Sequence, residues 1–149
     1  MTTVKINLIP TIKIKYLTDI DKLTSAHDGE WIDLRCAEDT YLSKGEFKLV
    51  PLGIKTQLPS GYEAIVAPRS STFKRYRILQ ANSIGVIDET YRGQWMFSAY
   101  ATEQTFIPKN DRICQFRIQK TQGNIAFEET DELNETERGD GGFGSSGEK

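Results

Sequence analysis

The chain has 149 residues and a formal net charge of -2, with 38% hydrophobic and 27% charged residues. This length fits one domain, and the hydrophobic fraction is enough for a modest core. The charge balance argues against a generic nucleic-acid coat and a basic membrane-surface helix, whereas a local cluster of arginines can still bind an anionic small molecule.

The N-terminal stretch alternates apolar and polar side chains, which is typical of half-buried strands. Because residues 1–10 contain no long apolar run, we expect neither a signal peptide nor a membrane span, and we expect a cytoplasmic protein. Residues 20–26 are a short helix candidate. The alternating apolar positions are Val4, Ile6 and Leu8, followed by Ile12, Ile14 and Tyr16.

The two cysteines and the single histidine give no metal signal. Cys36 and Cys114 form no C-x-x-C pair, and His27 has no ligand partner at a recognisable spacing. A zinc or redox site is therefore not expected. We predict two free, largely buried thiols in a reducing compartment.

The period of two continues along the chain. Residues 95–101 form a more continuous apolar run, which predicts a strand buried on both faces. Turns are predicted at 59–61 and 108–111, and a second short helix at 71–76. Many short strands favour an all-β barrel or a jelly-roll-like sandwich. The alternating apolar positions are Phe47, Leu49, Ile54, Ala64, Val66, Cys114, Phe116 and Ile118.

Four polar segments upstream of the tail are candidates for chemistry. Asp33 lies inside an apolar stretch, and Gln115 follows a charged turn. We expect the Gln115 side chain to point away from the core. Segment 68–71, Pro-Arg-Ser-Ser, offers a bidentate arginine and hydroxyls at a helix start, or simply a serine cap beside an exposed arginine. In segment 82–93 an apolar run ends at Asp88, which is either a turn former or a general base.

The C-terminal segment changes composition. It becomes acidic from Thr130, and then five glycines fall within residues 138–147. We expect a β-barrel domain, the candidate for any catalytic role, over residues 1–130 and a mobile arm over residues 131–149. The G-x-G-x-x-G spacing at 139–144 lacks the helix that a dinucleotide site needs. A flexible linker is the ordinary alternative, but Arg138 suits phosphate, Phe143 suits stacking, and glycine amides can cradle an anion.

In order and spacing, these five segments resemble the five motifs of the trimeric dUTPase family. The most specific matches are Gly-Val-Ile-Asp-x-x-Tyr-Arg-Gly at 85–93 and Arg-Gly-x-Gly-Gly-Phe-Gly-Ser-Ser-Gly at 138–147. The resemblance implies a dUTPase-type jelly-roll-like β-barrel with one or two short helices and a flexible tail. It also implies Mg²⁺-dependent hydrolysis of dUTP to dUMP and pyrophosphate, which limits uracil incorporation into DNA and supplies dUMP. A homotrimer is implied, in which each site draws on three subunits.

The resemblance also implies roles for single residues. Asp88 activates the water that attacks the α-phosphorus, Tyr91 packs under the sugar, and Asp33 acts on Mg²⁺ through water. Asn82 and the backbone of its hairpin read the uracil edge, and Phe143 stacks on the base. The residues implied in substrate binding are Arg69, Ser70, Ser71, Asn82, Gly85, Val86, Ile87, Tyr91, Met96, Gln115, Arg138, Phe143, Gly144, Ser145 and Ser146.

Some positions depart from the family pattern, and two other functions compete. The first motif reads Glu-Trp-Ile-Asp-Leu instead of Ala-Gly-Tyr-Asp-Leu, and Asn110 and Cys114 replace Gly and Ala in the fourth. A dCTP deaminase of the same fold would need a glutamate where this chain has Ser98. A nucleotide-sensing regulatory module is the other alternative. Neither a membrane partner nor direct nucleic-acid binding is expected.

Overall fold

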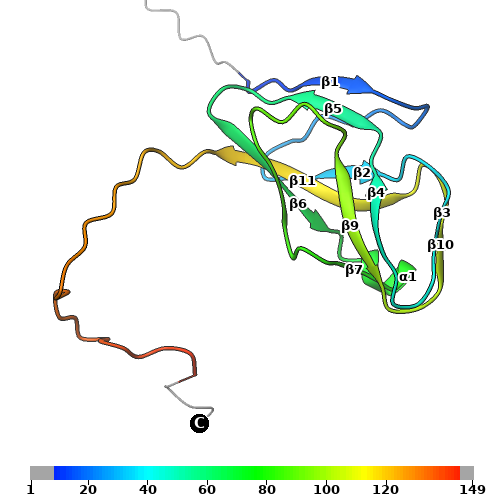
Figure 1. Ribbon diagram of the computed structural model, residues 1–149. Helices are drawn as coiled ribbons and strands as arrows, with labels where there is room; N and C mark the ends of the chain where they lie inside the picture. The colour runs from blue at the N-terminus through cyan, green and yellow to red at the C-terminus, as the bar shows by residue number, and fades with distance from the viewer. Residues whose placement is uncertain (1–8, 145–149) are drawn as a thin grey trace, which may run out of the picture.

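Short strands and one five-residue helix make up the regular structure of residues 9–144, the part of the chain that this computed structural model describes (Figure 1). The predicted all-β class is confirmed. Val4, Ile6 and Leu8, along with Ser145 and Ser146, lie outside the described residues. The elements are β1 Lys13–Tyr16, β2 Ile32–Arg35, β3 Thr40–Leu42, β4 Phe47–Pro51, β5 Ile54–Gln57, β6 Tyr62–Pro68, α1 Thr72–Tyr76, β7 Ile78–Gln80, β8 Gly85–Ile87, β9 Met96–Ala101, β10 Thr105–Ile107 and β11 Arg112–Lys120.

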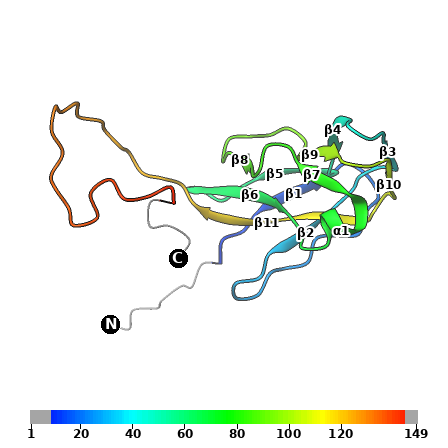
Figure 2. The same ribbon diagram turned by 90° about the horizontal axis from the view of Figure 1, so that it is seen from below.

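The strands form antiparallel sheets that wrap around one core (Figures 1 and 2). A four-stranded sheet has the order β2-β11-β6-β8, and a three-stranded sheet has the order β4-β9-β7. Two-stranded pairs, β1-β5 and β10-β3, complete the wall. Trp95 lies at the centre, where its ring meets the edge of Phe116 and its Nε1 donates to the Thr56 hydroxyl at 3.0 Å. This bond satisfies the indole N–H, so the large ring can be fully buried without an unpaired donor.

The helix predicted at residues 20–26 is wrong. The segment has no regular secondary structure because its amides bond to other partners. Leu23 N donates to the Tyr16 hydroxyl at 2.7 Å, and Asp21 N donates to the Asn110 side chain at 2.8 Å. These bonds, and the burial of Ile20, anchor the segment to the barrel in a non-helical conformation. The helix predicted at 71–76 is confirmed as α1.

The strand predicted to be buried on both faces is also wrong. In β9, Phe97 and Ala99 are buried, whereas Met96 and Tyr100 are exposed. The strand lies in an antiparallel sheet that covers the core with only one face, so burial alternates. The neighbouring strand β4 turns Phe47 and Leu49 outward, contrary to the burial expected from their period, and Val50 faces the core instead.

Both predicted turns are confirmed. Tyr62 N donates to Pro59 O at 3.1 Å, with Gly61 at a φ of 82°. Asp111 N donates to Pro108 O at 3.2 Å, and Asn110 has a φ of 77°. Asparagine tolerates this left-handed conformation better than most residues, so it replaces the family's glycine at little cost.

Residues 121–144 leave the barrel after β11 and carry no strand or helix, as both views show (Figures 1 and 2). Nearly every residue of this segment is exposed, including Ile125, Phe127 and Leu133. Within residues 9–144, no helix has the length and apolarity required to cross a membrane.

Candidate active site

Three of the predicted motifs meet at one end of the four-stranded sheet. The Asp33 carboxylate on β2 accepts from Arg69 Nε at 3.0 Å and from Arg112 Nη1 at 3.2 Å. Arg69 follows β6, and Arg112 opens β11, the strand that lies between β2 and β6. One carboxylate therefore holds two guanidinium groups side by side. Each guanidinium still has N–H donors for an anion, because it carries five.

A buried threonine fixes the loop that carries Arg69. Arg69 N donates to the Thr72 hydroxyl at 2.8 Å, and that hydroxyl donates to Ile113 O at 2.8 Å. The start of α1 is thus tied to β11. Ser70 is exposed and Ser71 is partly buried, and Ser71 at the N-cap makes no side-chain cap bond, so the serine cap that the sequence left open is not formed. The serine hydroxyls are left available to a ligand.

Gln115 lies in the same row of side chains as Asp33. On β11 it is paired with Asp33 on β2 and with Ala67 on β6. Its Nε2 donates to Pro68 O at 3.0 Å, and the side chain is partly buried. Gln115 faces away from the core, as its position in the strand predicted. It lies on β11, between Asp33 on β2 and the end of β6 that leads to Arg69.

The third motif forms a separate group at the end of β8. Asp88 is exposed, and its carboxylate has no hydrogen bond or ion pair among the described residues. Tyr91 folds back so that its hydroxyl donates to Gln94 O at 2.8 Å. A methyl group at Gly93 would overlap the Tyr91 ring and hydroxyl, so this ring position requires glycine there. The loop thus carries a fixed aromatic ring three residues after an unpaired carboxylate, and Tyr91 N donates to Asp88 O at 3.0 Å.

The hairpin before Asp88 presents its backbone at the surface. Strand β8 pairs with β6, with Gly85 opposite Val66, Val86 opposite Ile65 and Ile87 opposite Ala64. Asn82 is exposed in the preceding turn, and Val86 is 50% exposed whereas Ile87 is buried. Met96 is exposed at the first position of β9, three residues after Gly93.

The chain does not bring these two groups together. Asp88 follows the residue paired with Ala64 near the start of β6, and Arg69 follows the other end of β6. Six residues of extended strand separate the corresponding positions, which is roughly 20 Å at about 3.3 Å per residue. The tail is a third group. Arg138 Nε donates to Gly141 O at 2.6 Å inside a local turn, and both Phe143 and Gly144 are exposed.

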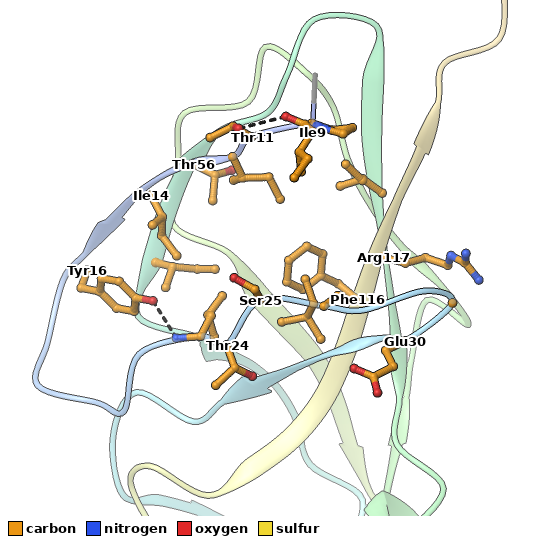
Figure 3. Close-up of a pocket in the computed structure, with 18 residues that line it drawn as sticks. Ile9, Thr11, Ile14, Tyr16, Thr24, Ser25, Glu30, Thr56, Phe116 and Arg117 are labelled. Carbon is orange, nitrogen blue, oxygen red and sulfur yellow. Dashed lines mark hydrogen bonds between the residues drawn. The ribbon is translucent and has the colours of Figure 1, made fainter. Parts of the chain in front are cut away.

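A cavity of about 560 Å³ lies elsewhere, beside β1 (Figure 3). Aliphatic side chains dominate its wall, among them Ile14, Ile54 and Ile118, and Tyr16 and Phe116 contribute aromatic rings. Thr11, Ser25 and Glu30 are among its polar groups. None of the predicted site residues lines it, so this cavity is separate from the predicted chemistry.

Both cysteines are buried and free, as predicted. Burial raises the pKa of the Cys36 and Cys114 thiols, so neither is poised as a nucleophile. Among the described residues, no group of three or more His, Cys, Asp and Glu side chains can hold a metal ion. The partly exposed Asp33 carboxylate pairs with two arginines and still reaches solvent.

A model of the dUTPase family matches residues 29–147. The chain belongs to the dUTPase family. It is 52% identical, over 93% of its length and 99% of the relative's, to the SPbeta prophage-derived deoxyuridine 5'-triphosphate nucleotidohydrolase of Bacillus subtilis. The family resemblance drawn from the sequence motifs is confirmed.

Solved dUTPase structures share the fold. The dUTPase of Staphylococcus bacteriophage 80alpha with dUPNHPP aligns with a TM-score of 0.77 at 20% identity, covering 92% of this chain and 98% of that one. A mutant dUTPase of phage phi11 of Staphylococcus aureus, in which a structural Mg(II) ion is coordinated, aligns with a TM-score of 0.71 at 15% identity, covering 83% and 98%. The dUTPase-type jelly-roll-like fold predicted from the sequence is confirmed.

The structure adds residues that sequence reasoning did not select. Arg112 completes the cation pair on Asp33, and Thr72 fixes the loop of Arg69. Gly93 makes room for the Tyr91 ring. Gly93 stands inside the motif quoted at 85–93, and Arg112 lies in the charged turn before Gln115, so the sequence contained a signal for both. Thr72 carried none, because its importance depends on the approach of β11.

Proposed function

We propose that this chain hydrolyses dUTP to dUMP and pyrophosphate in active sites shared between subunits of a homotrimer. The observation that carries the proposal is that the family's motifs form two groups of side chains, each suited to a different part of a nucleotide. One is the cation pair Arg69 and Arg112 on Asp33, and the other is the unpaired carboxylate of Asp88 beside Tyr91. The first suits a polyphosphate, and the second suits a sugar and an attacking water.

In the proposed reaction, Asp88 accepts a proton from a water molecule as that water attacks the α-phosphorus. The bond between the α-phosphorus and the bridging oxygen breaks, and pyrophosphate leaves in line. A positioned base is worth roughly 10²- to 10⁴-fold in rate. The exposed Asp88 carboxylate suits this role because no other side chain in residues 9–144 competes for its lone pairs.

Arg69, Arg112 and the hydroxyls of Ser70 and Ser71 bind the triphosphate in this proposal, with Gln115 beside them. Arginine binds phosphate oxygens through paired N–H donors, and the charge that builds on the leaving pyrophosphate strengthens these contacts. Asp33 keeps the two guanidinium planes close together despite their like charge. Without that carboxylate the two cations would repel each other.

Magnesium fits this site through water. The Asp33 carboxylate is partly exposed, and two oxygens have about four acceptor sites, of which the arginines use two. Magnesium retains several waters and prefers oxygen ligands, so one carboxylate acting through water together with phosphate oxygens satisfies it. When bound, the ion supplies neutralising charge to the triphosphate.

Uracil is read by the hairpin that contains Asn82, Gly85, Val86 and Ile87, with Met96 nearby. Uracil offers an acceptor at O4 and a donor at N3, whereas cytosine inverts both. A wrong base leaves polar groups unpaired, at roughly 1–3 kcal/mol each. Tyr91 fills the space that a 2'-hydroxyl would need, so the sugar is a deoxyribose.

Sharing of sites is supported by the separation of the two groups along β6. The backbone positions of the two groups are roughly 20 Å apart, at opposite ends of one strand. We infer that one subunit supplies Asp88 and Tyr91, a second supplies Asp33, Arg69 and Gln115, and a third lends the tail. Arg138, Ser145 and Ser146 contact the γ-phosphate in this arrangement, and Phe143 with Gly144 covers the base.

Exposed apolar side chains support the assembly. Phe47, Tyr100 and Leu79 form one row across β4, β9 and β7, and each is more than 40% exposed. Large contiguous apolar surfaces on a single chain mark interfaces. Ile125 and Phe127 in the tail are exposed as well. A second copy of the chain is the occupant that covers these side chains in the proposed trimer.

Turnover assays separate this function from its rivals. Pyrophosphate and ammonia release should be measured with dUTP, dCTP, dTTP and UTP, with and without Mg²⁺. We expect pyrophosphate from dUTP alone and only with the metal. Ammonia from dCTP would identify a deaminase, although Ser98 offers no carboxylate for that reaction. Binding without turnover would identify a sensing module.

The Asp88→Asn variant tests the base. We expect kcat to fall roughly 10²- to 10⁴-fold while the dissociation constant of dUTP changes little, because the amide keeps the shape but not the basicity. Glu103→Gln is the matched control, since it removes the same charge from an exposed turn outside the motifs. Retention of full activity in Asp88→Asn would refute the assigned base.

A further inference from the structure

The β1–β5 pair carries a groove with basic walls. The groove holds about 310 Å³, and four of its lining residues are the cations Lys13, Lys15, Lys55 and Arg92. All four are exposed, and none of them forms an ion pair within residues 9–144. On a chain with a formal net charge of -2, this cluster is a local exception that favours an anionic ligand.

Protection of a free strand edge does not explain the cluster. Lysines on an edge strand such as β1 commonly keep it from pairing with another chain. Lys15, however, lies directly opposite Lys55 in the β1–β5 ladder, where like charges repel and weaken the pair. Lys13 is two residues from Lys15 and therefore lies on the same face. The repulsion among the three is relieved when an anion lies over them.

Arg92 connects the groove to the loop of the candidate base. Its Nη1 donates to Glu89 O at 2.7 Å and to Tyr91 O at 3.2 Å. One guanidinium group therefore lines the groove and also holds the loop that follows Asp88. A chain segment that lies along the groove as far as Arg92 arrives beside Asp88 and Tyr91.

The tail of the chain carries the matching charge. Residues 128–137 include six carboxylates and no basic residue, and Arg138, which opens the glycine-rich motif, follows directly. All six carboxylates are exposed, and none forms an ion pair within residues 9–144. The six residues are Glu128, Glu129, Asp131, Glu132, Glu135 and Glu137.

The tail of a neighbouring chain suits the groove better than the chain's own tail. Thr121 N, where the tail begins, donates to Gly61 O at 2.9 Å, and Gly61 N donates to Glu89 Oε1 at 3.2 Å. The tail therefore begins beside the loop of its own Asp88. About 17 residues then lead to Arg138, or roughly 55 Å when extended, so the chain's own tail would have to double back. It leads away from β1 and β5 instead (Figures 1 and 2).

We propose that residues 128–137 of a neighbouring chain dock in the basic groove of β1 and β5 and so deliver the glycine-rich motif to Asp88. The role of this docking rests on the proposed function, in which a third subunit lends the tail. Ordering a segment without secondary structure costs conformational entropy. Pairs between carboxylates and ammonium groups offset part of that cost before the nucleotide binds. The motif then closes over dUTP from a position already close to it.

Cross-linking tests the docking without any substrate. A carbodiimide joins carboxylates to amines that are in direct contact. At low salt we expect covalent dimers and trimers on a denaturing gel, and mass spectrometry should find residues 128–137 linked to Lys13, Lys15 or Lys55. High salt should suppress these links, because it screens exposed pairs. Links that form only within one chain, or none to these three lysines, would overturn the proposal.

Charge reversal tests the consequence for catalysis. Lys15→Glu combined with Lys55→Glu keeps a like-charge pair across the ladder, so the fold bears the same repulsion as before. We expect the KM for dUTP to rise roughly tenfold and kcat to change less than about threefold, because saturating nucleotide still closes the tail. Asp131→Lys combined with Glu132→Lys should have the same effect. All four changes together should return KM to within about threefold of the unaltered chain.

The matched control is Lys44→Glu combined with Lys48→Glu, which changes the net charge equally at exposed positions outside the groove. We expect its KM to stay within about twofold of the unaltered chain. A rise in KM from the groove reversal without one from the tail reversal would overturn the proposal, since the groove would then bind another anion. If the groove reversal does not fold, Lys55→Gln replaces it, because it relieves the repulsion; an unchanged KM there and in the tail reversal would overturn the proposal equally.

Failure of this inference and failure of the proposed function are distinguishable. The cross-links need no turnover, so if they form in a chain that does not hydrolyse dUTP, the docking stands and the proposed function falls. If the chain hydrolyses dUTP but forms no such links and tolerates both reversals, only this inference is wrong.

Discussion

At the scale of single residues, the most informative position is Asp33. Its carboxylate holds Arg69 at 3.0 Å and Arg112 at 3.2 Å, and all three side chains remain partly or well exposed. Exposed ion pairs contribute little to stability, commonly less than about 1 kcal/mol. The value of this cluster therefore lies in the geometry it gives to the two guanidinium groups.

The Asp33→Asn variant follows from that reasoning. We expect the KM for dUTP to rise about tenfold and the Mg²⁺ requirement to shift to higher concentration, because the arginines lose their shared anchor and the metal loses its carboxylate. Thermal unfolding should hardly change. Asp21→Asn is the matched control, since Asp21 pairs with Arg35 at 3.6 Å outside the motifs. Steady-state kinetics at several Mg²⁺ concentrations would contradict the assignment if both variants behaved alike.

At the scale of elements, α1 connects the barrel to the loop that carries Arg69. Thr72 connects its first turn to β11, and Tyr76 at its end donates to the Asp111 carboxylate just before that strand. Burial, followed by the hydrogen bond to Asp111, raises the pKa of Tyr76 to about 12 from an ordinary value of 10.0. The helix is only five residues long, so such ties rather than intrinsic propensity hold it in place.

This pKa predicts how stability depends on alkaline pH. Below pH 10 the phenol is protonated in both states, so its bond contributes fully. Between about 10 and 12 the unfolded phenol ionises while the folded one stays protonated, and stability falls by roughly 2–3 kcal/mol. Tyr76→Phe should be less stable at pH 7 but should decline less over this window. Urea unfolding from pH 8 to 12, with Tyr41→Phe as the exposed control, measures the difference.

At the scale of the whole molecule, the candidate site residues of one chain lie in separate regions. Asp88 and the Asp33 cluster lie toward opposite ends of β6, and residues 121–144 run away from both (Figures 1 and 2). In the proposed homotrimer, copies of the chain complete one another's sites. Symmetric assembly brings different patches of identical chains together without any new sequence.

Two inactive variants should then rescue each other. Deletion of the residues after Glu137 should leave a folded, trimeric and nearly inactive protein. Co-expressed with Asp88→Asn, the truncated chain supplies an intact Asp88 and the full-length chain supplies an intact tail. Random mixing should restore about one quarter of the sites. Pyrophosphate release in the mixture measures this, and a mixture as inactive as its components would show that each chain uses its own tail.

The sequence by itself determined the fold class, the turns at 59–61 and 108–111, the helix at 71–76 and the family. These depend on local periodicity, on residues suited to turns, and on motifs whose order is written along the chain. It could not determine that residues 20–26 avoid a helix, since their amides are taken by Tyr16 and Asn110. Nor could it place Phe47 and Tyr100 on an outer face, since burial depends on which sheet face meets the core. Only the tertiary structure joined Asp33 to Arg69 and Arg112, because those contacts join strands far apart in sequence.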